Sequence, residues 1–229
     1  MLFTHHNPEM ELDKEHTALV MADLQNDFLR EDGSYYPLIA DSLRAHGTIE
    51  HIEQLLECAK DNDFAVVHSP HYYYPTDRQW VVPPGAIGHY LSTIDFVGRK
   101  DPVDLEGFEG SGADYAEGLK KYLMDGRTEN TSPHKFFSTE SNDVIKQLRL
   151  RRIQQVIMAG PVGNICLESH MRDIIEAGFE VAMVRDAVAG GRNDEGDGYQ
   201  AAMVNYRFMA NAVWTTEETV KRMEMAAAA

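Results

Sequence analysis

The residues most capable of chemistry centre on a cysteine that joins a predicted strand to a predicted helix. An apolar run at 155–159 precedes the segment Gly-Pro-Val-Gly-Asn-Ile-Cys at 160–166, and an amphipathic run follows at 167–177. The amides of a first helical turn and the positive end of a helix dipole favour a thiolate over a thiol. Cys166 therefore has the setting of a nucleophile; the alternative is a small buried side chain in a strand-to-helix turn.

Two ionisable residues occupy comparable positions. Asp23 directly follows an apolar run at 17–22, and Lys135 lies just before a helix expected to start at about 138–141. Ligands of open α/β sheets bind beyond the carboxyl ends of the strands, so we expect both residues to lie near Cys166. The plainer alternatives are an aspartate that caps a turn and a lysine on the surface.

The elements that would position these residues alternate along the chain. Apolar runs typical of buried strands lie at 17–22, 65–67, 156–159, 181–184 and 212–214. Helical patterns lie at 49–59, 167–177 and about 199–209, and Thr215 or Thr216 is expected to cap a last helix. The repeated order predicts an α/β fold with a mostly parallel sheet, helices on both faces and one domain over 1–229.

The segment at about 72–131 departs from this order. It is rich in Gly, Pro, aromatic and acidic residues, and only one helix is predicted in it, at about 115–124. A connection of this length in a compact domain is typical of a lid or a binding loop. We therefore expect it to cover the site.

Composition restricts the possible partners and location. The chain has 229 residues and a formal net charge of -16, which argues against nucleic acid and anionic membranes as partners. The segment 1–8 lacks the features of a signal peptide, and no apolar run approaches the ~18 residues of a membrane span. The two cysteines, Cys58 and Cys166, lack zinc or redox-pair spacing. A cytoplasmic protein is expected, with Cys58 in a packing role.

The chain resembles the isochorismatase-like cysteine hydrolases, which include nicotinamidase and N-carbamoylsarcosine, biuret and ureidoacrylate amidohydrolases. The resemblance covers most of 15–220 and rests on the segments 23–28, 134–135, 160–166, 168–170, 178–181 and 186–187. It implies a doubly wound α/β fold, a homo-oligomer and a triad of Asp23, Lys135 and Cys166. It also implies a cis peptide bond before Val162.

Such a triad suits cleavage of a C–N bond without a cofactor. Asp23 is the expected base, and the ammonium of Lys135 would favour the thiolate. Attack of the Cys166 sulfur on a carbonyl gives an oxyanion, then a thioester with loss of ammonia or an amine, and water hydrolyses the thioester. The backbone N–H groups of Val162 and Cys166 are the expected oxyanion donors.

Several residues near these positions are expected to contact a small-molecule substrate. Phe28 is a candidate pocket wall, and Gln25 and Asn164 either touch the substrate or hold the turn. Tyr72, Tyr73, Tyr74 and Trp80 line a pocket, pack against the core or lie at a subunit interface. His71 matches a histidine of the nicotinamidase metal motif, but Ser69 replaces the expected aspartate, and His68 and His89 are weak further ligands. No metal is therefore predicted, and His71 is expected to contact the substrate or to have a structural role.

Three other functions remain open at this point. The first is hydrolysis of a vinyl ether of the isochorismatase type, which does not require the cysteine. The second is a non-catalytic binding subunit that retains the fold. The third is a peroxide sensor, which a low pKa of Cys166 would allow.

Overall fold

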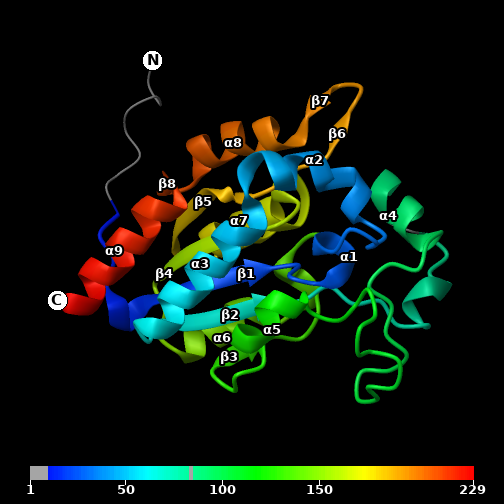
Figure 1. The fold of residues 1–229 in the computed structure, drawn as a ribbon, viewed down its shortest axis with the longest axis horizontal. Helices are drawn as coiled ribbons and strands as arrows, with labels where there is room; N and C mark the ends of the chain where they lie inside the picture. Colours follow the sequence, from blue (N-terminus) through cyan, green and yellow to red (C-terminus); the bar gives the residue numbers. More distant parts are fainter. Residues whose placement is uncertain (1–9, 83–84) are drawn as a thin grey trace.

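The computed structural model describes residues 10–82 and 85–229, so the segment 1–8 considered above lies outside it. Its centre is a sheet of six parallel strands in the order β3-β2-β1-β4-β5-β8 (Figure 1). The strands are β1 Thr17–Ala22, β2 Ala65–Ser69, β3 Thr128–Asn130, β4 Gln155–Gly160, β5 Glu180–Val188 and β8 Ala212–Trp214. The predicted α/β fold is confirmed, and the strand order reverses between β1 and β4.

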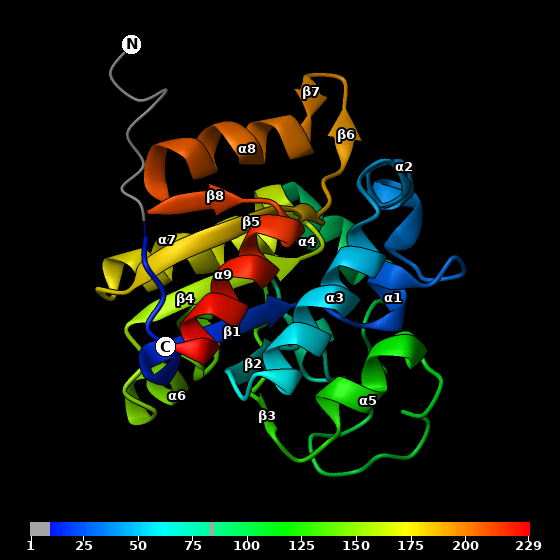
Figure 2. The same ribbon diagram turned by 60° about the vertical axis from the view of Figure 1, so that its left-hand side comes forward.

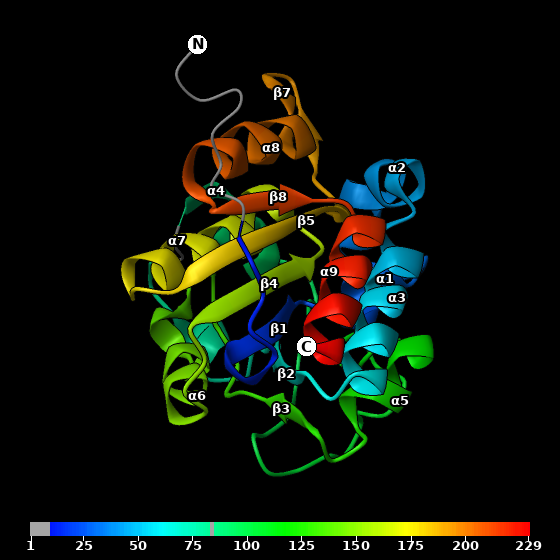
Figure 3. The ribbon, with the colours of Figure 1, turned by 90° about the vertical axis from the view of Figure 1, so that its left-hand side faces the viewer.

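Helices cover both faces of the sheet (Figures 2 and 3). Successive side chains of a strand point to opposite faces, so Leu19 and Met21 join one apolar cluster and Val20 joins the other. The first cluster includes residues of α2 Tyr36–His46, α3 Thr48–Asp61, α5 Lys120–Leu123 and α9 Thr216–Ala228. The second includes residues of α6 Val144–Leu150, α7 Glu168–Glu176 and α8 Gly198–Met209. Burial on both faces explains the continuous apolar runs of the strands.

The connection at 72–131 contains little regular structure. It holds the 3-10 turns η2 Asp77–Gln79 and η3 Glu117–Leu119, the helices α4 Gly85–Ser92 and α5, and the edge strand β3. The helix predicted at about 115–124 is only a short one. Tyr115 pairs with Gln25 in an isolated β-bridge, which keeps the backbone extended where that helix was expected to begin.

The remaining elements are short. They are η1 Lys14–His16, α1 Asn26–Leu29, η4 Thr139–Ser141, the π-helical turn η5 Gly163–Leu167, and the two-stranded ribbon of β6 Arg192–Asn193 and β7 Gly196–Asp197. Within the described ranges, no helix has both the length and the apolar character needed to cross a bilayer.

An ion pair fastens the end of α3 to the start of β3. The Lys60 ammonium lies 2.9 Å from Asp125, whose carboxylate also accepts from the N–H groups of Arg127 and Thr128. Although burial opposes it, these partners lower the pKa of Asp125 to about 2. A carboxyl whose pKa is lower in the folded state stabilises that state above its unfolded pKa, and the effect disappears as the pH falls from about 4 to about 2.

Because Asp125 is exposed and solvent screens its ion pair, we expect Asp125→Asn to reduce the free energy of unfolding by about 1 kcal/mol at neutral pH and by almost nothing near pH 2. Urea unfolding of both proteins across this range measures the difference. An equal loss of stability at both ends of the range would show that the ion pair does not cause it.

Candidate active site

The candidate site lies where β1 and β4 end side by side. β2 lies beyond β1 and β5 beyond β4, so the connections that leave these two central strands diverge and open a crevice. Asp23, the first residue after β1, has a left-handed backbone with φ 62°, a conformation that aspartate tolerates better than most residues. Its N–H donates to the Ser69 carbonyl at 3.2 Å, which ties it to the end of β2. The backbone thus fixes Asp23 at the crevice.

The turn after β4 differs in one respect from the expectation. The bond between Pro161 and Val162 is trans, and the described residues contain no cis peptide bond. Val162 instead has φ 61° and ψ 57°, which is uncommon for a β-branched residue. The Tyr206 hydroxyl donates to the Gly163 carbonyl at 2.7 Å and supports η5, which carries Cys166.

Four side chains converge in the crevice. Suitable donor atoms of Asp23, His71, His134 and Cys166 all lie within 4.8 Å of one another. Asp23 Oδ1 is 3.2 Å from His134 Nε2 and 3.9 Å from His71 Nδ1. The thiol donates to the Phe136 carbonyl at 3.5 Å. No member of the group is more than 4% exposed, so the reactive atoms are shielded from water.

Lys135 is placed elsewhere. Its ammonium forms an ion pair with Asp77, donates to the Tyr72 carbonyl at 3.1 Å and lies 3.9 Å from the centre of the Tyr74 ring. Among the described residues, Asp23 makes no ion pair with a lysine. The expected placement of Lys135 beside Asp23 is therefore corrected.

His134 occupies the place predicted for the lysine. Residues 134 and 135 belong to an extended segment in which His134 pairs with His71 in a parallel β-bridge. Neighbouring side chains of an extended segment point in opposite directions, so only one of the two residues can face Asp23. The sequence contains the dipeptide His134-Lys135, but it does not reveal which of the two side chains faces Asp23.

The environment favours a neutral thiol. Burial and the charge of Asp23 raise the pKa of Cys166 well above its usual range, and burial raises the pKa of Asp23. Burial also lowers the pKa of His71 to about 3 and that of His134 well below its usual value, so neither ring supplies a positive charge. The expected resting thiolate is corrected, and the peroxide-sensor interpretation loses its support.

The histidines after β2 do not form the nicotinamidase-type metal set. Ser69 stands at the position of the expected aspartate, and its hydroxyl contacts the rings of His134 and His170. Both ring nitrogens of His68 are hydrogen-bonded, and His89 is exposed on α4. The residues present therefore do not fit that metal site.

Gln25 and Phe28 surround His71. The Gln25 amide donates to the His71 carbonyl at 2.6 Å and accepts from its N–H at 2.8 Å, so it holds this backbone and not the turn after β4. The Phe28 ring lies 6.3 Å from the His71 ring and is buried. Asn164 lies two residues before Cys166 in η5, and its buried side-chain oxygen has no hydrogen-bond partner within the described ranges. Of Gln25 and Asn164, it is Asn164 that keeps a polar atom without a partner among the described residues, and its side chain lies against Gly198.

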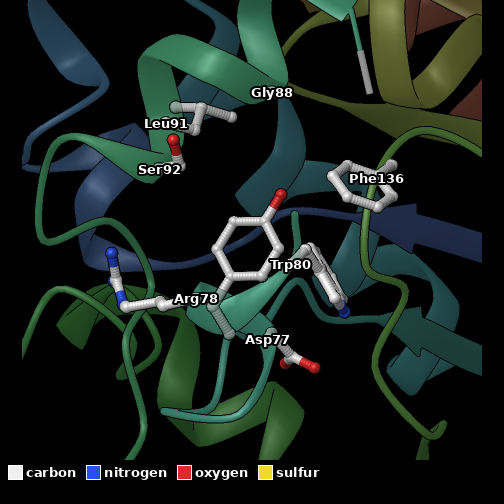
Figure 4. A pocket seen from close by; sticks show the side chains of 8 residues that line it. Asp77, Arg78, Trp80, Gly88, Leu91, Ser92 and Phe136 are labelled. Atoms are coloured by element: carbon white, nitrogen blue, oxygen red, sulfur yellow. The ribbon is translucent and has the colours of Figure 1, made fainter. Parts of the chain in front are cut away.

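A cavity adjoins the site on the side of α4. Trp80 and Phe136 line it on one side, and Leu91 and Ser92 of α4 lie opposite (Figure 4). Of the candidate tyrosines, Tyr73 and not Tyr72 joins this cavity to the site, because the Tyr73 ring also lies 4.9 Å from the His71 ring.

Tyr72 points into a different cluster, where its ring lies 6.0 Å from that of Phe108 and beneath the Arg99 guanidinium. The predicted role of Trp80 as a lining residue agrees with its position, whereas Tyr72 lies outside the cavity. The alternation of side chains along the extended segment after β2 separates Tyr72 from Tyr73.

Gly160 sets the distance between the ends of β1 and β4. Its φ is 140°, and a Cβ there would overlap the Ala22 carbonyl oxygen. We expect Gly160→Ala to reduce the free energy of unfolding by about 3 kcal/mol, because steric overlap adds to backbone strain. Chemical unfolding measures the loss. Gly118→Ala is the matched control, since a Cβ at Gly118 would contact nothing within 4 Å; equal effects of the two substitutions would exclude this explanation.

Comparison with known proteins gives consistent matches. An isochorismatase-domain family model matches residues 17–218. Ureidoacrylate amidohydrolase RutB of Rhizobium rhizogenes is 30% identical over 178 residues, which cover 75% of this chain and 69% of that protein. The RutB protein of Agrobacterium fabrum is also 30% identical, with 75% of both chains covered.

Solved structures share the fold. A cysteine hydrolase from Pseudomonas syringae aligns with a TM-score of 0.77 and 20% identity over 95% of this chain and 97% of its own. Nicotinamidase PncA from Bacillus subtilis aligns with a TM-score of 0.66 and 19% identity, covering 90% of this chain and all of its own. N-carbamoylsarcosine amidase from Thermoplasma acidophilum has a TM-score of 0.62 and 15% identity, with 91% and 98% covered.

Proposed function

Because this chain belongs to the isochorismatase family, we propose that it is a cysteine-dependent hydrolase that cleaves a C–N bond of a small amide, carbamoyl or ureido compound. The observation that carries the proposal is the placement of the Cys166 sulfur within 4.8 Å of a buried Asp23 carboxylate oxygen that accepts no hydrogen bond within the described ranges. The similar RutB proteins, nicotinamidase and N-carbamoylsarcosine amidase carry names that refer to amide-type substrates.

The first step moves a proton from sulfur to carboxylate. The resting thiol points to the Phe136 carbonyl, and rotation of the Cys166 side chain turns it to Asp23. A carboxyl whose pKa is raised by burial is a stronger base than one in water, which favours the transfer. The sulfur then bonds to the substrate carbonyl carbon, the C–N bond breaks, and the leaving nitrogen takes the proton from Asp23.

His134 stabilises the carboxyl group while it holds this proton. The ring is neutral, and its Nε2 lies 3.2 Å from Asp23 Oδ1. Protonated Asp23 donates to this nitrogen, so His134 acts on the carboxyl group and does not supply the positive charge expected of a lysine. Once the amine has left, Asp23 accepts a proton from water and the resulting hydroxide oxygen bonds to the thioester carbonyl carbon. The C–S bond then breaks, and Asp23 returns the proton to the sulfur, which regenerates the thiol.

Backbone N–H groups stabilise the oxyanion in this proposal. Val162 is buried, and its N–H makes no hydrogen bond with any described residue. The Cys166 N–H faces its own sulfur and thus the carbon under attack. Two such donors matter more here than in a site with a lysine, because no lysine or arginine of the described ranges forms an ion pair with Asp23.

Substrate entry requires movement of the segment 72–131. The cavity next to the site has a volume of about 30 Å³, enough for about two water molecules. An amide substrate is larger, and α4 forms one wall. Displacement of α4 would join this cavity to Cys166, as expected of a lid.

Neighbouring substitutions distinguish His134 from Lys135. We expect His134→Leu to lower kcat by about 100-fold, because Asp23 loses its acceptor, and Lys135→Met to lower it by less than about 10-fold. Steady-state kinetics of the two variants, with thermal unfolding to confirm their folds, makes the comparison. A larger loss in Lys135→Met would restore the lysine to the triad.

Ammonia release across a panel of carbamoyl, ureido and nicotinamide-type amides tests the proposed function. We expect turnover of at least one class by the purified protein in the presence of a chelator. Failure on every amide, together with cleavage of a vinyl ether by Cys166→Ala, would favour the isochorismatase type of reaction instead.

A further inference from the structure

We propose that Asp23, His71, His134 and Cys166 form a binding site for one zinc-class divalent metal ion. Their donor atoms lie within 4.8 Å of one another, and all four side chains are more than nine-tenths buried. Within the described part of the chain, both Asp23 oxygens, His71 Nδ1 and His134 Nε2 have no hydrogen-bond partner. Four buried polar atoms aimed at one point are costly unless something binds there.

Hydrogen bonds fix the His71 ring as a metal ligand. Its Nε2 lies 2.9 Å from the Lys135 carbonyl oxygen. A carbonyl only accepts, so this nitrogen carries the hydrogen and Nδ1 presents a lone pair toward Asp23. Ligating histidines in proteins are oriented in this way by an acceptor at the other nitrogen.

A longer chain of hydrogen bonds fixes the His134 ring. His170 Nδ1 contacts two carbonyl oxygens and therefore carries its hydrogen, so His170 Nε2 accepts from the Ser69 hydroxyl. Asn142 Nδ2 donates to the same hydroxyl oxygen, and its Oδ1 accepts from the Val144 N–H, which fixes the amide orientation. His134 Nδ1 must then donate to Ser69, and its Nε2 presents a lone pair to Asp23.

The ligand set selects the metal. One sulfur, two imidazoles and one carboxylate suit Zn²⁺ and Co²⁺, whereas Mg²⁺ and Ca²⁺ prefer oxygen ligands. A tetrahedral ion with bonds of about 2.0–2.3 Å places its ligand atoms roughly 3.3–3.8 Å apart. Asp23 Oδ1 is 3.2 Å from His134 Nε2 and 3.9 Å from His71 Nδ1, so small side-chain shifts complete the geometry.

Metal binding excludes the proposed hydrolysis, a consequence that rests on the proposed function. Binding removes the thiol proton to solvent and commits the sulfur lone pair to the ion, so Cys166 no longer attacks a carbonyl. Asp23 as a ligand no longer accepts a proton. Four protein ligands also leave a tetrahedral ion no open position for substrate.

Titration of the full, metal-free protein with Co²⁺, followed by Zn²⁺, tests the site. We expect one equivalent to bind with a thiolate-to-cobalt absorption band and the visible spectrum of a tetrahedral site, and Zn²⁺ to displace it. Cys166→Ser should remove the thiolate band, and His134→Leu should weaken binding at least about 100-fold. His89→Ala is the matched control and should bind as the parent does. His71→Asn repeats the test if His134→Leu does not fold.

Absence of stoichiometric binding, or an unchanged thiolate band in Cys166→Ser, overturns the site. The spectra need no substrate, so they are independent of the amide screen, which is run with a chelator. For a substrate found in that screen, Zn²⁺ should abolish turnover and the chelator should restore it. Full turnover by the zinc-saturated protein overturns the exclusion of catalysis.

Discussion

Cys166→Ala is expected to lower kcat for amide hydrolysis by at least about 1,000-fold, with the fold intact. The sulfur is the only protein atom in the proposed mechanism that bonds to substrate carbon, and no described side chain beside it is assigned that step. The substitution removes one buried atom from a helical turn that Val162 and Tyr206 continue to hold. Ammonia release measures activity, and thermal unfolding verifies the fold.

The second cysteine provides a matched control for this substitution. Cys58 lies on α3, where its thiol is directed to the Val220 carbonyl at 3.9 Å, far along the sheet from Asp23. Cys58→Ala should therefore retain the parent kcat. Activity that survives Cys166→Ala, or that is lost equally in both variants, rules out Cys166 as the nucleophile.

Asp23→Asn is expected to lower kcat by about 1,000-fold and to increase alkylation of Cys166 at alkaline pH. The amide has the size of the carboxyl group and tolerates the left-handed backbone at φ 62°, so the fold should persist. It accepts no proton, which stops the first step. Since the charge of Asp23 raises the pKa of Cys166, its removal lowers that pKa and increases the thiolate fraction.

These opposite changes separate a base from a residue that merely supports the site. Turnover and the rate of iodoacetamide labelling are measured on the same preparation, with peptide mapping to identify Cys166. A general loosening of the structure would raise labelling of Cys58 as well. Lower turnover accompanied by slower labelling of Cys166 would show that Asp23 does not act on the sulfur in the way proposed.

The strands that position the site could be predicted because both of their faces are buried, which makes them continuous apolar runs in the sequence. The run at 17–22 and the run at 212–214 match β1 and β8 at both ends, and Thr215 caps α9 as one of the two threonines considered. Asp23 and Cys166 follow strands of a parallel sheet, so topology alone brings them together. Placement at a strand end does not depend on details of side-chain packing.

The third member of the group could not be predicted in the same way. His134 and Lys135 are neighbours in an irregular segment, and the choice between them depends on the bridge from His134 to His71 across 63 positions. The prediction of a resting Cys166 thiolate was wrong for a related reason. That prediction assumed that the Lys135 ammonium would lie beside the sulfur, whereas burial without a neighbouring cation favours the neutral thiol.

The helices around the site show where local signals were missed or overruled. α2 has Pro37 in its first turn and Gly47, with φ 58°, at its end, and these are the usual boundary residues of a helix. In contrast, the helix expected from about Tyr115 conflicts with the β-bridge to Gln25. The homo-oligomer and the cytoplasmic location expected from the sequence stay predictions.

Mass analysis of the protein quenched during turnover tests the central claim most directly. With enzyme in excess over the best amide substrate, we expect the acyl part of the substrate on Cys166 alone, located by peptide mapping and removed by hydroxylamine as a thioester. An acyl group on another side chain, or an unmodified Cys166 at every quench time from milliseconds to complete turnover, contradicts the account.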